Sequence, residues 1–199
     1  MWISLLLKLY TVKVYLSSYR YSENNMTKLT FADTLKQYSI DIWQKILSHR
    51  FIMELSSDIL PLNKFVFYLR QDHYFLEEFS RFLQSAKQKT SDNKMKEWLH
   101  SLYLSTINFE MEMQKQLLNS LAASASSPSN TTASYYEFFP CRTTLEYTSY
   151  LINTSSTGTF SEIVSVMAPC PWTYLEIAQK LSKIPIRNLQ ELAAVLFFR

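Results

Sequence analysis

Apolar residues recur at helical spacing along most of this chain. Between residues 30 and 47 they return every three or four positions, and the residues concerned are Leu35, Tyr38, Ile42, Ile46 and Leu47. Similar patterns continue over about 51–55, 62–89, 92–122, 141–152 and 160–183, and a last helix is expected from about 187 to the end. The aromatic segment 62–89 shows no alternation that would favour a β-strand. We therefore predict an all-α fold whose helices form a compact antiparallel bundle.

Prolines and polar stretches predict where these helices begin and end. Pro61 and Ser91 stand directly before the two longest helices, where a proline or a serine suits the first turn. Segment 123–133 is dominated by Ser, Ala, Asn and Thr and predicts a linker. Segment 153–159 contains the glycine of the chain, Gly158, and predicts a turn.

Length and composition favour one globular domain. With 199 residues, of which 47% are hydrophobic, the chain is long enough to bury a core. We expect residues 30–199 to form this domain and residues 1–29 to be an N-terminal extension. Residues 1–21 are apolar but are interrupted by Lys8 and Lys13, so they fit neither a membrane-spanning helix nor a signal peptide. No membrane association is expected.

Composition also disfavours several classes of function. A single glycine argues against glycine-rich phosphate loops and dinucleotide-binding fingerprints. The net charge of +3 is too small to indicate a nucleic-acid partner. Two cysteines do not make a disulfide framework and fit reduced thiols in a cytosol. The three histidines show no metal-binding spacing, so no metal site is expected.

Cys170 lies between two prolines inside the helical pattern of residues 160–183. Pro171 has no N–H group, and the rings of Pro169 and Pro171 crowd the preceding turn, so a kink or break is expected here. A helix that restarts at this point directs backbone N–H groups and the positive end of its dipole toward the cysteine, which lowers the pKa of a thiol. The alternative is a buried structural cysteine beside a kink, and this stretch alone leaves both interpretations open.

Asp72 stands among apolar positions of the aromatic segment. Apolar side chains lie three, four or seven residues away from it, namely Phe65, Tyr68, Leu69, Phe75, Leu76 and Phe79. A carboxylate on such an inward face needs hydrogen-bond donors, because its desolvation is otherwise costly. A bound ligand with N–H groups could supply them, and so could Arg70, Lys64 or a backbone donor at the edge of the helix.

Three motifs of the chain resemble those of the TenA, or thiaminase type II, family. They are Gln71-Asp72-His73-Tyr74 followed by Leu76 and Phe79, then Thr144-Leu145-Glu146-Tyr147-Thr148-Ser149-Tyr150, and then Pro169-Cys170-Pro171-Trp172-x-Tyr174-x-Glu176. Their order and spacing make the resemblance specific, and it covers about residues 31–186. The resemblance implies a heme-oxygenase-like helical bundle that assembles as a homo-oligomer, a tetramer in this family, in the cytoplasm.

The resemblance also implies a function in thiamine salvage. Family members hydrolyse thiamine or its aminomethylpyrimidine breakdown products to hydroxymethylpyrimidine, without a metal or a cofactor. Carried over by position, Cys170 would be the nucleophile that adds to the pyrimidine ring, and Asp72 would hold the amino side of that ring. Phe75, Tyr147 and Tyr174 would line the pocket and position the substrate and the thiol. The expected partner is therefore a small pyrimidine.

Two departures from the family pattern bear on the expected activity. Phe75 stands where many members have tyrosine, so the ring can stack but its hydroxyl is lost. The chain ends soon after Cys170, and Asn188–Arg199 does not resemble the family's continuation, which carries an acid/base glutamate and closes the bundle. We therefore expect a member that lacks the last family helices and exposes an apolar face. The alternative to an enzyme is a catalytically impaired or inactive binding protein of this fold.

Three other residues could suggest a functional site, but we expect none of them to belong to one. Glu110 and Glu112 have no histidine partners for a metal site, so we expect them on a solvated helix edge. Cys141 follows Pro140 at a helix start, a location that activates a thiol in principle. It matches no family motif, and we expect it to be incidental.

Overall fold

The computed structural model describes residues 31–57, 59–124 and 138–181, and within these ranges it contains helices and short connections but no β-strand. The predicted all-α fold is therefore confirmed. The described residues fall into two compact units, one of residues 61–168 and the other of residues 31–60 together with 169–181. The extension 1–29, most of the predicted linker 123–133 and the helix expected from 187 lie outside the described residues. That residues 30–199 act as one domain stays a prediction.

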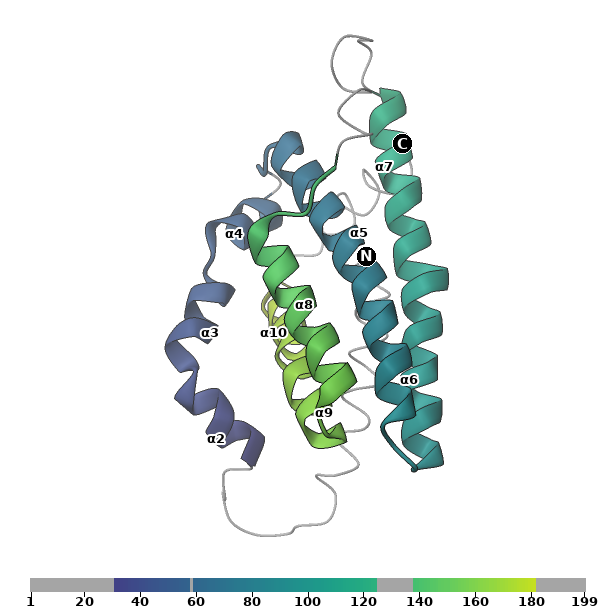
Figure 1. The fold of residues 1–199 in the computed structure, drawn as a ribbon. Helices are drawn as coiled ribbons and strands as arrows, with labels where there is room; N and C mark the ends of the chain where they lie inside the picture. The colour runs from purple at the N-terminus through teal and green to yellow at the C-terminus, as the bar shows by residue number, and fades with distance from the viewer. Residues whose placement is uncertain (1–30, 58, 125–137, 182–199) are drawn as a thin grey trace. The chain divides into compact units, whose positions relative to one another are not determined.

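The unit of residues 61–168 is built around the long helix α5 (Leu62–Gln88). One side of α5 contacts the succession α6 (Asn93–Ser105), η1 (Thr106–Met111) and α7 (Glu112–Ser124), and another side contacts α8 (Arg142–Thr157). The short helix α9 (Phe160–Met167) packs on α8. In Figure 1, α5 is seen between α8 and the rod that contains α6 and α7.

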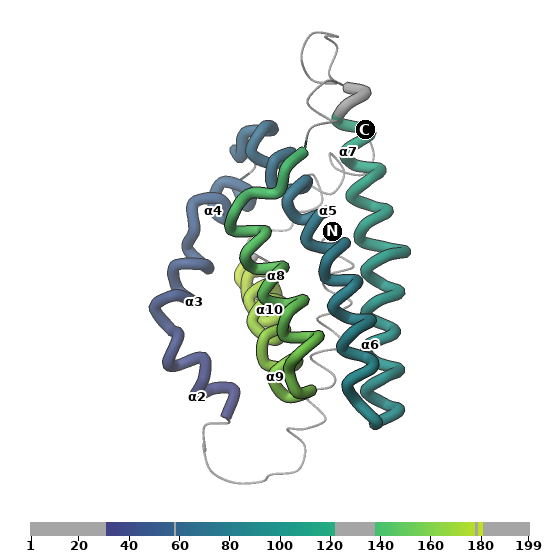
Figure 2. Tube along the Cα trace, in the orientation of Figure 1, coloured from purple at the N-terminus to yellow at the C-terminus, as the bar shows by residue number. Residues whose placement is uncertain are grey.

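The core of this unit lies where α5, α6, α8 and α9 meet. Its buried members are Phe82, Leu83, Ala86, Leu99, Leu151, Ile163 and Met167. Such residues are apolar and recur at helical spacing, so their burial supplies the main stabilisation of the unit. The helices α6, η1 and α7 continue one another without a break (Figure 2), and η1 is a π-helical turn inside this rod. The single predicted helix 92–122 is thus confirmed in its extent, with an irregularity that the sequence pattern did not indicate.

The helix starts follow the predicted caps with one shift. Pro61 is the residue that precedes α5, as predicted. The cap of α6 is Asp92 and not Ser91, because the Asp92 carboxylate accepts hydrogen bonds from the backbone N–H groups of Lys94 and Met95. An aspartate at this position also has a favourable charge for the positive end of the helix dipole.

The turn predicted at 153–159 is wrong, because α8 continues to Thr157. In this stretch, Ser and Thr hydroxyls donate hydrogen bonds to backbone carbonyls of the preceding turn. Thr154 donates to Tyr150 O at 2.9 Å, and Thr157 donates to Asn153 O at 2.9 Å. Side chains that bond locally in this way tolerate a helical backbone although their propensity is low. Gly158 then ends the helix, and its N–H donates to Thr154 O at 2.8 Å.

The unit of residues 31–60 and 169–181 contains three short helices and α10 (Pro169–Leu181). The short helices are α2 (Phe31–Tyr38), α3 (Ile40–Leu47) and α4 (Arg50–Ser56), and Figure 2 shows them as successive short coils. The helix predicted from residue 30 is interrupted at Ser39, so it forms two helices, α2 and α3. The second of these, α3, packs on α10. The apolar side chains that defined the pattern here are largely exposed, whereas Trp43 is buried.

The helical run of residues 160–183 is broken, as predicted from its prolines. The helix α9 ends at Met167, and α10 begins at Pro169. Pro169 and Pro171 occupy the first turn of α10, where a missing N–H removes no intrahelical bond. Cys170 is therefore the second residue of a new helix.

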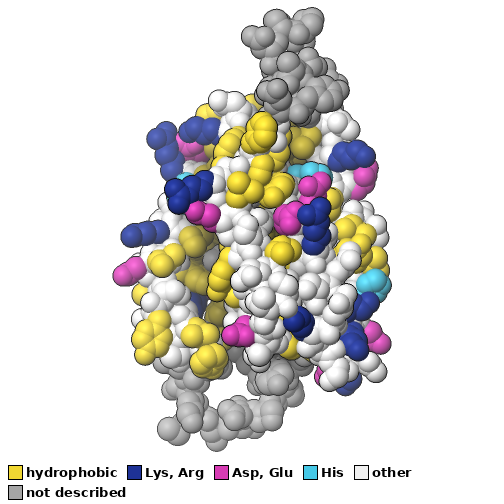
Figure 3. Space-filling view, viewed as in Figure 1, with side chains coloured by type: hydrophobic (Ala, Val, Ile, Leu, Met, Phe, Trp, Pro, Cys, Tyr) yellow, Lys and Arg dark blue, Asp and Glu magenta, His cyan; other side chains and the backbone are white. Residues whose placement is uncertain are grey.

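The described residues include no helix long and apolar enough to cross a membrane. On the face shown in Figure 3, lysine and arginine side chains are interspersed with acidic ones. Two of the exposed ion pairs each join neighbouring turns within a helix. Arg81 pairs with Glu78 in α5, and Arg142 pairs with Glu146 in α8, each at 2.7 Å. Exposed pairs of this kind contribute little to stability.

Candidate functional site

Asp72 lies on α5 and is half-buried. Its Oδ2 accepts a hydrogen bond from Nε2 of Gln114, a residue of α7 that is only 2% exposed. The Oε1 atom of the same amide lies 3.2 Å from Nδ1 of His73. The carboxylate thus accepts from a neutral donor on another helix. Sequence reasoning had offered a ligand, Arg70, Lys64 or a backbone donor for this role, and it had not named Gln114.

Phe75, one turn beyond Asp72 on α5, stacks on Tyr147 of α8. The two ring centroids are 5.7 Å apart and the rings are inclined by 5°. The stack continues along α5 through Phe79, at 5.4 Å from Phe75, and Phe82, at 5.6 Å from Phe79. A row of stacked aromatic rings therefore begins within one turn of the Asp72 carboxylate, with Phe75 and Tyr147 half-buried at its start and Phe82 fully buried in the core.

Cys170 and Tyr174 lie in the other unit, four residues apart on α10 and therefore on one side of that helix. Both are half-buried. The Thr173 hydroxyl donates to the backbone carbonyl of Cys170 at 2.9 Å. The structure thus brings together Asp72, Phe75 and Tyr147 in one unit and Cys170 with Tyr174 in the other. That these five residues form a single site remains a prediction.

Glu176, the last residue of the cysteine motif, joins α10 to the short helices of its unit. Its Oε2 accepts a hydrogen bond from Trp43 Nε1 at 2.7 Å, and its Oε1 forms an ion pair with Lys36. The Trp43 ring meets the Trp172 ring edge-on, with centroids 5.2 Å apart. These contacts hold the helix that carries Cys170, so Glu176 has a structural role that sequence reasoning did not assign.

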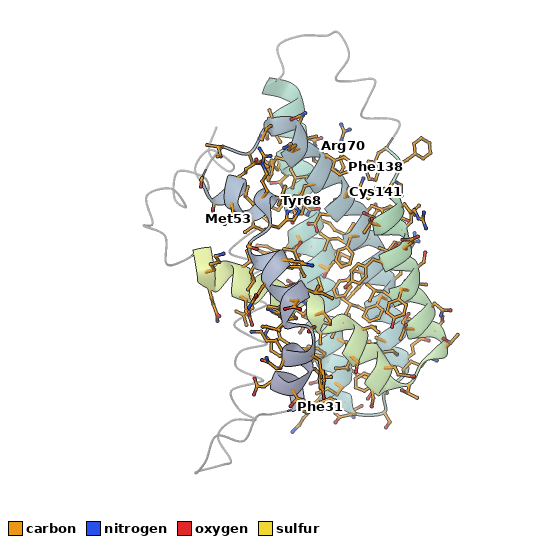
Figure 4. All side chains as sticks on the ribbon, turned by 90° about the vertical axis from the view of Figure 1, so that its left-hand side faces the viewer. Phe31, Met53, Tyr68, Arg70, Phe138 and Cys141 are labelled. Carbon is orange, nitrogen blue, oxygen red and sulfur yellow. The ribbon has the colours of Figure 1, made fainter. Side chains whose placement is uncertain are left out.

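Cys141 is the N-cap residue of α8, where the segment from Phe138 enters the helix (Figure 4). Its Sγ lies 3.2 Å from the Thr144 hydroxyl, and its N–H donates to Oε1 of the buried Gln71 at 2.9 Å. The hydrogen bond with the Thr144 side chain, aided by backbone N–H groups of the first turn, lowers the pKa of the Cys141 thiol. Cys141 thus lies at the helix start where the sequence placed it. Both cysteines of the chain are thiols rather than partners in a disulfide.

The expectation for the two glutamates is half wrong. Glu112 is exposed, but Glu110 is 7% exposed because the π turn η1 directs it into the unit. Within the described part of the chain, no group of three His, Cys, Asp or Glu side chains could hold a metal ion.

Gln114 is the main residue that sequence reasoning missed. It lies four residues after Glu110 and four before Leu118, and all three are buried. The argument that singled out Asp72, a polar residue among apolar positions at helical spacing, applies equally to Gln114 and would have found it.

Comparison with known proteins relates the chain to one family. The model of the TENA/THI-4/PQQC family matches residues 39–193. A protein of Halalkalibacterium halodurans named aminopyrimidine aminohydrolase is 29% identical over 157 residues, which are 79% of this chain and 67% of that protein. Proteins of the same name from Helicobacter pylori and Bacillus subtilis are 28% and 24% identical, over 76% and 77% of this chain and 66% and 62% of theirs. The chain thus spans about two thirds of the length of these relatives.

Solved structures show the same fold. A TenA homologue from P. horikoshii superposes with a TM-score of 0.66 at 29% identity, covering 83% of this chain and 76% of that one. A structure titled as a TenA family transcription regulator from Silicibacter superposes with a TM-score of 0.68 at 20% identity, covering 83% and 71%. The heme-oxygenase-like helical fold expected from the sequence agrees with these neighbours.

Proposed function

The chain belongs to the TENA/THI-4/PQQC family, and we propose that it is an aminopyrimidine aminohydrolase of the thiaminase II type that acts in thiamine salvage. The proposed substrate is a small pyrimidine with an aminomethyl group, or thiamine itself. The names of the relatives from three bacteria support this assignment.

The observation that carries the proposal is the half-buried Asp72 carboxylate one turn from the stacked rings of Phe75 and Tyr147. A carboxylate accepts hydrogen bonds and does not donate them when ionised, so it selects a ring that presents an amino group. The stacked rings offer a flat apolar surface to the face of that ring. Phe75 retains this surface without the hydroxyl of a tyrosine.

Cys170 is the proposed nucleophile. As the second residue of α10, it lies in the first turn of a helix, near the positive end of the helix dipole. The thiolate adds to the pyrimidine ring, the amine on the aminomethyl carbon leaves as ammonia, and water takes its place as a hydroxyl before the thiolate departs. The net reaction consumes one water and releases one ammonia. Tyr174, on the same side of α10, is proposed to position the substrate and the thiol.

The test is ammonia release from 4-amino-5-aminomethyl-2-methylpyrimidine by the purified chain. Cys170→Ser should abolish turnover, whereas Asp72→Asn should mainly raise KM. Cys141→Ser is the matched control, because it removes the other thiol and leaves the proposed site intact. Full turnover by Cys170→Ser would exclude the cysteine mechanism. Binding of the pyrimidine without ammonia release would favour an inactive binding protein of the same fold.

We further propose that the protein is a cytoplasmic homotetramer, as the family resemblance implies. Its two cysteines, both thiols, fit a reducing compartment. Light scattering coupled to size-exclusion chromatography measures the mass of the assembly. A mass of one chain at working concentration would refute the tetramer.

A further inference from the structure

Gln114 joins two consecutive residues of α5 through one amide group. Its Nε2 donates to Asp72 Oδ2, and its Oε1 lies 3.2 Å from His73 Nδ1. Gln114 itself is 2% exposed on α7. A buried amide is costly unless it is hydrogen-bonded, so these two contacts determine how the side chain is held.

The direction of each hydrogen bond follows from the donors and acceptors present. The carboxylate of Asp72 accepts, so the NH₂ group of Gln114 must face it and the carbonyl oxygen must face His73. That oxygen can only accept, so His73 Nδ1 must carry a hydrogen atom. The other ring nitrogen, Nε2, lies 3.9 Å from the carboxylate of Glu77.

The π turn η1 explains how Gln114 reaches this position. Thr106, Glu110, Gln114 and Leu118 recur every four residues, and all are buried. Four residues of an α-helix exceed one turn by about 40°, so an unbroken α-helix would rotate this series away from α5. The wider turn at Thr106–Met111 compensates for the rotation.

We propose that Gln114 is a positioning residue for the aminohydrolase reaction, one that holds the Asp72 carboxylate in the orientation that receives the amino group of the substrate. This inference rests on the proposed function. Because the amide is neutral, it orients the carboxylate without cancelling its negative charge. The bond therefore supports substrate recognition in a way that a cationic partner in its place would oppose.

Gln114→Glu and Gln114→Met test this role. The methionine keeps the volume of the side chain but removes the donor, and KM should rise about 10-fold or more with a smaller change in kcat. The glutamate brings a second carboxylate against Asp72, so the pair retains a proton to higher pH. The acid limb of the pH profile of kcat/KM should therefore move to higher pH.

The matched control is Gln116→Glu. Gln116 lies two residues further along α7, is exposed and bonds to Glu112 within its own helix, so the substitution adds the same charge outside the contact. The Gln116→Glu variant should have the same KM and the same pH profile of kcat/KM as the wild type. The helices that meet here carry further ionisable side chains, and all the variants retain them. They include Arg70, His73, Tyr74, Glu77 and Glu78 on α5, Glu110 on η1, Glu112 and Lys115 on α7, and Glu146 and Tyr147 on α8.

The outcomes separate this inference from the proposed function. If the wild type releases ammonia but Gln114→Glu, Gln114→Met and Gln116→Glu share its KM and pH profile, the positioning role is wrong. If the wild type releases none, the proposed function fails, and the inference about the reaction fails with it. NMR resonances of the His73 ring nitrogens show which nitrogen carries the hydrogen. This measurement on the wild type needs neither enzymatic activity nor a folded variant. The neutral wild-type ring should carry its hydrogen on Nδ1, and a hydrogen on Nε2 alone would overturn the arrangement.

Discussion

Trp43 Nε1 donates a 2.7 Å hydrogen bond to Glu176 Oε2, which joins α3 to α10 across 133 positions of the sequence. The other oxygen of the same carboxylate pairs with Lys36 of α2. Glu176 therefore connects three helices of its unit through one side chain. Because α10 also carries Cys170 and Tyr174, the orientation of both proposed site residues depends on a contact outside the proposed chemistry.

Replacement of Glu176 by alanine should destabilise this unit by about 2 kcal/mol, because it leaves the Trp43 N–H and the Lys36 ammonium without their acceptor. Glu176→Gln should cost less, since its amide oxygen still accepts from Trp43. Urea unfolding followed by near-UV circular dichroism, which senses the Trp43–Trp172 contact, measures both. If both variants lose the same free energy of unfolding, the hydrogen bond to Trp43 contributes nothing to stability.

Replacement of Gly158 by alanine should lower the free energy of unfolding by about 1–3 kcal/mol, because the new methyl group has no room. A Cβ at this position would lie 2.7 Å from the backbone oxygen of Thr154. The φ angle of Gly158 is −81°, so the effect is steric contact and not a strained dihedral. Ser156→Ala, at an exposed position of the same helix end, is the control and should change thermal stability little.

The capping box of α9 should make stability depend on pH. Thr159 donates to the Glu162 carboxylate through its backbone N–H at 2.7 Å and its hydroxyl at 2.8 Å, and these bonds lower the pKa of Glu162. A carboxyl whose pKa is lowered by folding stabilises the protein at pH values above its unfolded pKa. This contribution is lost as the pH falls through the folded pKa.

The difference in melting temperature between the wild type and Glu162→Gln measures this contribution. The wild type should be the more stable of the two at neutral pH, and the difference should shrink as the pH falls below the ordinary carboxyl range. A difference in melting temperature that stays constant from neutral to acid pH would contradict the stabilising role of the Glu162 carboxylate.

The Cys141 thiol should react with iodoacetamide at lower pH than an ordinary cysteine, because its pKa is lowered. Thr144→Val removes the hydroxyl that lies 3.2 Å from the Cys141 Sγ atom and also donates to Oε1 of Gln71, and it should shift the pH profile of alkylation to higher values. Thr143→Val is the control, because Thr143 is exposed and acts on the thiol through its backbone N–H, which the substitution keeps. Peptide mass spectrometry separates Cys141 from Cys170, and coincident profiles for the two threonine variants would refute the role of the Thr144 hydroxyl.

Much of the local structure could be predicted from the sequence because it depends on interactions within a turn or two. The apolar period of the segment 62–89 predicted α5 to within one residue at its end, since each backbone hydrogen bond spans four residues. The two prolines around Cys170 predicted the break after α9 for the same reason, because a missing N–H and a ring clash act locally. The motifs around Asp72, Tyr147 and Cys170 were sufficient to identify the family.

Other features were decided by contacts between distant residues. Gln114 and Asp72 are 42 positions apart, and Trp43 and Glu176 are 133 apart, so no local pattern links them. The burial of Glu110 depends on a π turn, and the burial of Trp43 on the packing of α3 against α10. The sequence by itself thus determined where most helices lie and which residues carry the proposed chemistry. The tertiary structure decided which side chains hold those residues in place, because such partners are set by packing between helices and not by the period of any one of them.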